Sequence, residues 1–267
     1  MGKTSKIIYA IGDVHADKSA AVETFELAKL CDNNETWIAE NVVVIQTGDL
    51  TDRGPDGKST LELFRKWEKE ASTKNSELIL LMGNHEAMNI QGDWRYVSQQ
   101  DVYSFGSLAE RKKVFMKGGE WHDWIMQRDA VALVDGNLFL HGGLSEDYSD
   151  LSIDEINNRV HQALRENPKD PILSEKGPLW YRGYLQKEEG IACGELDRVL
   201  KKYDAKRMII GHTTQRNGEI AVRCGGKLIG IDTGISKHYG SSKSILEINQ
   251  NDAKAIYPNK ILDVMDP

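Results

Sequence analysis

Short apolar runs alternate with amphipathic segments along the first half of the chain. Three runs, 7–11, 42–45 and 78–82, have the length and composition of buried strands. Between them, residues 18–30 and 58–71 place apolar side chains at helical spacing. This strand–helix–strand alternation predicts parallel pairing in an α/β sheet with helices on its faces.

The second half begins with a segment of different character. Residues 87–130 are polar and rich in aromatic side chains, which predicts a helical insertion beside the sheet. Two strands follow at 138–140 and 208–210, separated by helices near 154–166 and 194–203. The tail predicts a meander with strands at 220–222, 228–231, 244–248 and 253–256. We therefore expect one α/β domain over residues 1–267, built as a two-sheet β-sandwich flanked by helices.

Five polar strings come directly after apolar runs. They are Gly12–His15, Gly48–Gly54, Gly83–Glu86, His141–Gly143 and Gly211–Thr213. Because ligands bind beyond the carboxyl ends of the strands in open α/β sheets, these strings should meet at one edge. They supply the candidate metal ligands Asp13, His15, Asp49, Asn84, His141 and His212.

The ligand types narrow the choice of metal. Carboxylate, imidazole and amide groups without a thiolate suit Mn²⁺ foremost, with Fe or Zn²⁺ as alternatives. Two divalent ions in such a site would lie ~3.5–4 Å apart and share a carboxylate and a hydroxide. The sequence therefore predicts a dinuclear metal centre.

Further candidates have the chemistry of phosphate ester cleavage. His85 directly follows a candidate ligand and can point past the metals as a general acid, with Asp52 holding its imidazole protonated. Arg53 offers a planar fork to phosphate oxygens. Arg182, between aromatic residues and a glycine, is a candidate second phosphate contact, and Tyr239 is a candidate for the pocket rim. A solvated turn at Asp52-Arg53 and an ordinary stacked surface residue at Arg182 are the alternatives.

Composition excludes several partners. The 267 residues include 41 acidic and 34 basic side chains, a net charge of −7, which argues against nucleic-acid binding. No apolar stretch approaches the ~20 residues of a membrane-spanning helix, and the first strand follows polar residues rather than a secretory segment. We expect a cytoplasmic protein without membrane contact, although a chain freed of its signal peptide would read the same.

The cysteines number three and are widely spaced: Cys31, Cys193 and Cys224. With no C-x-x-C pair, the sequence predicts free thiols in or near the core, and neither a disulfide framework nor a thiolate zinc site. Arg198 follows Cys193 by five positions rather than six, so the loop of cysteine-dependent phosphatases is absent.

Taken in order, the polar strings resemble the phosphoprotein phosphatase family of metallophosphoesterases over residues 12–213. Segments 83–89, 92–97 and 177–183 look like its Shewanella-like branch. The resemblance implies that one ion is held by Asp13, His15 and Asp49, and the other by Asp49, Asn84, His141 and His212. It also implies an acid pair, Asp52–His85, with Arg53 and Arg182 on the phosphate.

The same resemblance implies a substrate class. Members of the branch are associated with dephosphorylating proteins, often at phosphotyrosine, so a phosphorylated protein or peptide is the expected partner. Ala16 stands where the family has a glycine after the first histidine, a small change that should leave the metal loop intact. The eukaryotic cysteine-bearing segment has no equivalent near Tyr239-Gly240, so no regulatory subunit is expected.

The predicted function is direct hydrolysis of phosphomonoesters by a hydroxide that bridges the two metals. Phosphotyrosine is the foremost substrate, with phosphoserine and phosphothreonine next. A dinucleoside polyphosphate hydrolase of the diadenosine tetraphosphate type is the main alternative, and a metal-dependent binding module without catalysis is a third.

Overall fold

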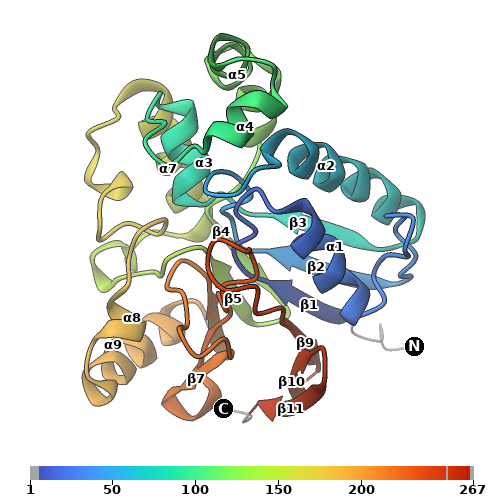
Figure 1. The fold of residues 1–267 in the computed structure, drawn as a ribbon. Coiled ribbons are helices and arrows are strands. Elements are labelled where there is room, and N and C mark those ends of the chain that lie inside the picture. The colour runs from blue at the N-terminus through green and yellow to red at the C-terminus, as the bar shows by residue number, and fades with distance from the viewer. Residues whose placement is uncertain (1–5, 251, 265–267) are drawn as a thin grey trace.

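A computed structural model of the chain describes residues 6–250 and 252–264 (Figure 1). Its strands form a six-stranded sheet in the order β11-β10-β9-β1-β2-β3 and a five-stranded sheet in the order β4-β5-β6-β8-β7. The first sheet contains β1 (Ile7–Ile11), β2 (Val42–Gln46), β3 (Glu77–Leu80), β9 (Ile245–Asn249), β10 (Asp252–Tyr257) and β11 (Lys260–Val264). The second contains β4 (Val131–Val134), β5 (Asn137–Leu140), β6 (Arg207–Ile210), β7 (Ala221–Arg223) and β8 (Leu228–Gly230).

Each sheet has a parallel centre. β1, β2 and β3 run parallel, as do β5, β6 and β8. The helices that flank the sheets are α1 (Lys18–Leu27), α2 (Gly57–Thr73), α7 (Ile153–Glu166), α8 (Gly183–Gln186) and α9 (Glu189–Lys202). Figure 1 shows α1 and α2 beside β1–β3, and α8 and α9 at the opposite end of the molecule. The predicted α/β sandwich flanked by helices is therefore confirmed. None of the described helices has both the length and the apolar content to cross a bilayer.

The core lies in two layers, which explains the unbroken apolar runs in the sequence. Ile8 and Ala10 of β1 pack in a cluster that also contains Ile209 of the other sheet, whereas Tyr9 and Ile11 belong to the cluster that includes the helices. Successive side chains of a strand point to opposite faces. Both faces are buried here, so both sets of positions are apolar.

The tail strands do not form one meander. β7 and β8 pair antiparallel at the edge of the five-stranded sheet, whereas β9 and β10 belong to the other sheet. β11 was not predicted, and its neighbouring apolar residues Ile261 and Leu262 are both exposed. They show no alternation between a buried and an exposed face, so the sequence carries no period-2 signal there.

The predicted insertion is helical. Its helices are α3 (Asn84–Ile90), α4 (Gln99–Ser104), α5 (Leu108–Phe115) and α6 (Glu120–Ile125), and α4 and α5 stand at the top of Figure 1. Phe115, Trp121 and Trp124 are buried in the main core, whereas Tyr103 is exposed.

The prediction of three free thiols is wrong for two of them. Cys193 on α9 and Cys224, which opens the 3₁₀ turn η3 (Cys224–Gly226), form a disulfide, whereas Cys31 keeps its thiol and is buried. The pair is 31 residues apart and has no motif spacing. Only the packing of α9 against η3 brings the two cysteines together, and that contact is tertiary.

We expect this disulfide to stabilise the fold by about 3 kcal/mol, because it closes a loop of moderate length in the unfolded chain. In urea denaturation, dithiothreitol should lower the unfolding midpoint of the wild type. The double variant Cys193→Ser, Cys224→Ser should have a lower midpoint than the wild type without any reductant. Dithiothreitol should not lower the midpoint of this variant further. A wild type indifferent to dithiothreitol would show that the pair does not form.

Candidate active site

The candidate ligands come from the carboxyl ends of strands in both sheets. Asp13 and Asp49 follow β1 and β2, and Asn84 opens α3 after β3. His141 and His212 follow β5 and β6 of the other sheet. The two sheets therefore bring their polar loops to one place, as the strand-end rule predicts.

The loops that carry these residues have unusual backbones. Five non-glycine residues of the site have positive φ: His15, Asp49, Asp52, Arg53 and His212. Such conformations cost free energy and persist only where the surroundings enforce them. The Asp49 side chain also packs directly against the backbone of Gly83. Any larger residue would clash there, since a Cβ at this position would lie 2.2 Å from Asp49 Oδ1.

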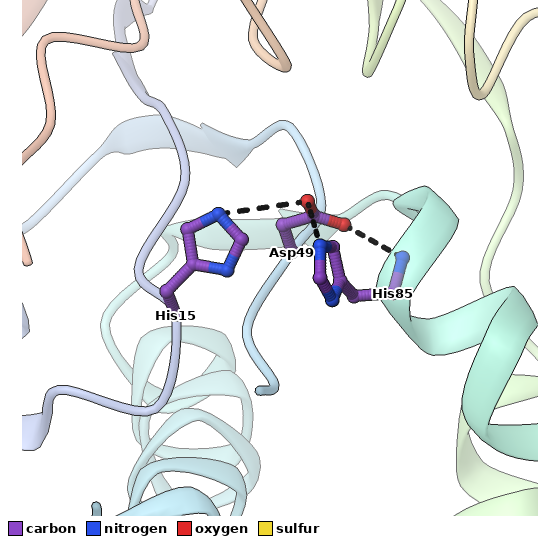
Figure 2. Close-up of side chains that lie close together, drawn as sticks. All are labelled: His15, Asp49 and His85. Carbon is purple, nitrogen blue, oxygen red and sulfur yellow. Dashed lines mark hydrogen bonds and ion pairs between the residues drawn. The ribbon is translucent and has the colours of Figure 1, made fainter. Parts of the chain in front are cut away.

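Asp49 lies at the centre of the cluster. Its Oδ2 is 3.7 Å from His15 Nε2, 3.8 Å from His85 Nε2 and 3.2 Å from His141 Nε2 (Figure 2 shows the first two). The other oxygen accepts the His85 backbone N–H at 2.9 Å. Burial opposes ionisation of Asp49, but His141 and His85 outweigh it and hold the pKa of this carboxyl well below its usual value. Asp49 is thus an ionised carboxylate shared by imidazoles from three loops.

The imidazoles are arranged as metal ligands are. Backbone carbonyls of Thr51 and Thr47 contact Nδ1 of His15 and His141 at 3.3 and 2.9 Å, so both rings turn Nε2 toward the candidate ligands. His141 Nε2 lies 2.9 Å from Oδ1 of Asn84, which is itself a candidate ligand. Burial lowers the pKa of His15 to about 3, so its ring is neutral.

Two further observations fit a bound cation. His212 Nε2 is buried and has no hydrogen-bond partner among the described residues. Burial raises the pKa of Asp13 well above its usual value and that of Asp232 above it, and at Asp13 the carboxylates of Asp232 and Asp49 add to this effect. A divalent ion would satisfy the free imidazole nitrogen and neutralise the carboxylates. Two groups of side chains around Asp49 are close enough to hold an ion: His15, Asp49 and His85; and Asp49, His141 and His212.

The predicted acid pair is in contact. Asp52 Oδ2 lies 2.8 Å from His85 Nδ1, and both side chains are buried. Burial disfavours the imidazolium, but Asp49 and Asp52 outweigh it and raise the pKa of His85 above its ordinary value. The ring therefore keeps a proton and presents Nε2 on the side of Asp49 (Figure 2).

The predicted phosphate-binding residues line the same cavity, whose volume is about 150 Å³. Arg53 stacks 3.8 Å above the Tyr96 ring, and its buried Nε has no hydrogen-bond partner in the described part of the chain. Arg182 donates to the carbonyl oxygen of His212. The Tyr239 ring lies 4.9 Å from that of His15. The lining residues are Asp13, His15, Asp49, Arg53, Asn84, His85, Tyr96, Trp180, Arg182, His212, Thr214 and Tyr239.

This arrangement has a counterpart among known proteins. The family model for calcineurin-like phosphoesterases matches residues 7–216. The chain belongs to the calcineurin-like phosphoesterase family. This phosphoesterase is 35% identical to Shewanella-like protein phosphatase 1 of Plasmodium berghei, over 93% of its own length and 73% of that protein. It is 34% identical to an uncharacterized protein of Schizosaccharomyces pombe, over 97% and 83% of the two chains.

Solved structures share the fold. The cold-active protein-tyrosine phosphatase of a psychrophilic Shewanella species superposes with a TM-score of 0.86 at 24% identity, over 98% of this chain and 81% of that one. A symmetrical bis(5'-nucleosyl)-tetraphosphatase of Methylobacillus flagellatus is a more distant match, 23% identical over 78% of this chain and 64% of its own. The resemblance inferred from the polar strings is thus confirmed, and the chain is a metal-dependent phosphoesterase.

Several residues of the phosphoesterase site were not singled out in the sequence. Glu86 is buried and accepts hydrogen bonds from the backbone N–H groups of Asp49, Thr51 and Gly83, so it fixes two of the loops. Asp232 follows β8. The sequence pattern that could have identified it is the one that identified Asp13, an apolar run followed by an aspartate. Tyr96, Trp180 and Thr214 also line the cavity. Tyr96 and Trp180 lie in segments 92–97 and 177–183, which resemble the Shewanella-like branch, but no role was assigned to either residue.

Proposed function

We propose that this phosphoesterase is a protein phosphatase that removes phosphate from phosphotyrosine foremost, and from phosphoserine and phosphothreonine next. Two divalent ions, Mn²⁺ in the first place, would be held by Asp13, His15, Asp49, Asn84, His141 and His212. The names of relatives and structural neighbours support the protein-phosphatase part of this proposal.

One observation carries the proposal: His85 of the acid pair, both arginines and all the candidate metal ligands except His141 line a single small cavity. The side chains of Tyr96, Trp180 and Tyr239 also line it, so a phenyl ring could pack against aromatic walls while its phosphate reaches the metal ligands. Alkyl esters of serine would gain less from these walls. The cavity chemistry therefore favours an aryl phosphomonoester.

Each residue has a separate task in the proposed reaction. The ions, when bound, supply an activated water nucleophile and neutralise phosphate charge. Arg53 and Arg182 bind the phosphoryl oxygens and orient the ester. His85, held by Asp52, donates its proton to the departing phenolate oxygen. Ester and water become phenol and inorganic phosphate without a covalent phosphoenzyme.

The test compares three substrates on one preparation. Metal-stripped protein should be inactive, and Mn²⁺ should restore hydrolysis of a phosphotyrosine peptide faster than of the matched phosphoserine peptide. Diadenosine tetraphosphate should be poor, because the cavity offers two arginines and no further basic cluster for a polyphosphate chain. Faster turnover of diadenosine tetraphosphate would favour the dinucleoside polyphosphate alternative. Metal binding without turnover of any substrate would favour a binding module.

We also propose a cytoplasmic location, as the sequence predicts, and the disulfide provides its test. Disulfides form and persist mainly in oxidising compartments, so a cytoplasmic protein would hold Cys193 and Cys224 as thiols in the cell and form the disulfide only after it leaves the cell. Alkylation of intact cells, followed by reduction and a second label, would report the redox state of Cys193 and Cys224. A fully reduced pair in the cell is expected for the cytoplasm, and a fully oxidised pair would contradict it.

A further inference from the structure

A buried arginine of the insertion contacts the rear of the acid pair. Arg111 lies on α5 and is only 1% exposed. Its Nη2 is 3.2 Å from Asp52 Oδ1, the carboxylate oxygen that does not contact His85. Both oxygens of Asp52 are therefore engaged, one by the imidazole and the other by the guanidinium.

Asn89 closes a ring of contacts around the same carboxylate. Its amide Nδ2 donates to Asp52 Oδ1 at 2.9 Å and to the carbonyl oxygen of His85 at 2.8 Å. Its Oδ1 accepts from Arg111 Nη1 at 2.6 Å, and this contact fixes which way the amide faces. Arg111 thus restrains Asp52 both directly and through Asn89.

The remaining contacts hold the guanidinium itself in place. Arg111 Nε donates to Asp101 Oδ2 at 2.8 Å, and Asp101 Oδ1 accepts the N–H of Gly57 at the start of α2. The rings of Phe115 and Phe105 lie 4.5 and 5.5 Å from the Arg111 guanidinium carbon. A flexible long side chain is thereby fixed in one orientation, as a residue that positions another group must be.

The cost of burying this charge argues that it has a purpose. A buried ion pair is often no more stabilising than apolar residues of the same volume, so stability alone does not account for an arginine here. A carboxylate that orients an imidazole through one oxygen, however, is itself fixed only if a hydrogen-bond donor binds its other oxygen. The insertion supplies that contact from 59 residues along the chain.

We propose that Arg111 is a positioning residue for proton donation: it fixes the Asp52 carboxylate so that His85 keeps Nε2 directed at the leaving-group oxygen. The proposal rests on the proposed function, in which His85 is the acid. It makes the helical insertion part of the catalytic apparatus, although its helix α5 contributes no side chain to the cavity lining.

The test uses leaving groups of different acidity, because proton donation matters only for poor ones. With Mn²⁺ present, Arg111→Met should lower kcat on phenyl phosphate about tenfold to a hundredfold. On 2,4-dinitrophenyl phosphate it should stay within about twofold of wild type. Metal content should be unchanged. The matched control is Arg128→Met. Arg128 lies just after α6 and pairs with Glu68, and its replacement should alter neither rate.

A double-mutant cycle separates positioning from a general structural effect. In an Asp52→Asn background, Arg111→Met should cost less than about a further twofold, since both changes disable one unit. If Arg111→Met fails to fold, Arg111→Lys keeps the charge but cannot reach three acceptors at once, so a smaller loss confined to phenyl phosphate is expected. Equal losses on both esters, full additivity with Asp52→Asn, or wild-type rates would each overturn the proposal.

The same substrates keep this proposal distinct from the proposed function. Equal losses on phenyl phosphate and 2,4-dinitrophenyl phosphate in His85→Asn itself would show that His85 is not the acid, and the proposed mechanism would fail. A selective loss in His85→Asn without one in Arg111→Met would refute the role of Arg111 alone.

Discussion

Asp49→Asn is expected to lower kcat on a phosphotyrosine peptide by about 10³-fold or more. Asp49 is the carboxylate shared by the two groups of this site that could hold an ion, one with His15 and His85 and the other with His141 and His212. The amide would remove the negative charge that lies within 3.2 to 3.8 Å of three imidazoles. Metal ions contribute several kcal/mol to such reactions, and about 1.4 kcal/mol corresponds to tenfold in rate.

The measurement is kcat together with metal content by mass spectrometry. Wild type should bind two ions per chain, and Asp49→Asn fewer. Asp170→Asn makes the same change at a carboxylate outside the cavity, where it pairs with Arg159, and should keep both ions and the full rate. Wild-type turnover by Asp49→Asn would rule out a dinuclear centre around this residue.

The part of the site that follows strand ends could be predicted from the sequence. Parallel strands share a direction, so residues after Ile11, Gln46 and Leu80 must meet at one edge, and their types are visible in the sequence. The contact of Asp52 with His85 also follows, since both belong to loops at that edge. Their roles in catalysis stay predictions until the variants are measured.

Features that depend on packing between distant segments could not be predicted. Arg111 lies in the run Glu110-Arg111-Lys112-Lys113, which reads as an exposed face, and only the fold turns this one side chain inward. The Cys193–Cys224 pair was hidden for the same reason. Such residues have no local spacing that separates them from ordinary surface positions.

His85→Asn is expected to lower kcat on a phosphotyrosine peptide by roughly 10²–10⁴. Nδ1 of the imidazole contacts Asp52, and Nε2 lies on the side of Asp49. Because the pKa of His85 is raised, its protonated form persists above the pH at which an ordinary histidine loses its proton. As pH rises through that raised pKa, proton donation is lost and the wild-type rate should fall. The asparagine variant should lack this fall, because amides do not titrate.

The geometry allows a second role for His85, as a metal ligand with His15 and Asp49, and the same variant distinguishes the two roles. A general acid matters little for an ester of a very acidic phenol, so 2,4-dinitrophenyl phosphate should be hydrolysed nearly as fast as by wild type, with both ions retained. A ligand matters for every ester, so loss of an ion and equal losses on both substrates would replace the acid role. His122→Asn removes another imidazole whose Nδ1 lies 2.8 Å from an aspartate, but outside the cavity, and should change neither rate nor metal content.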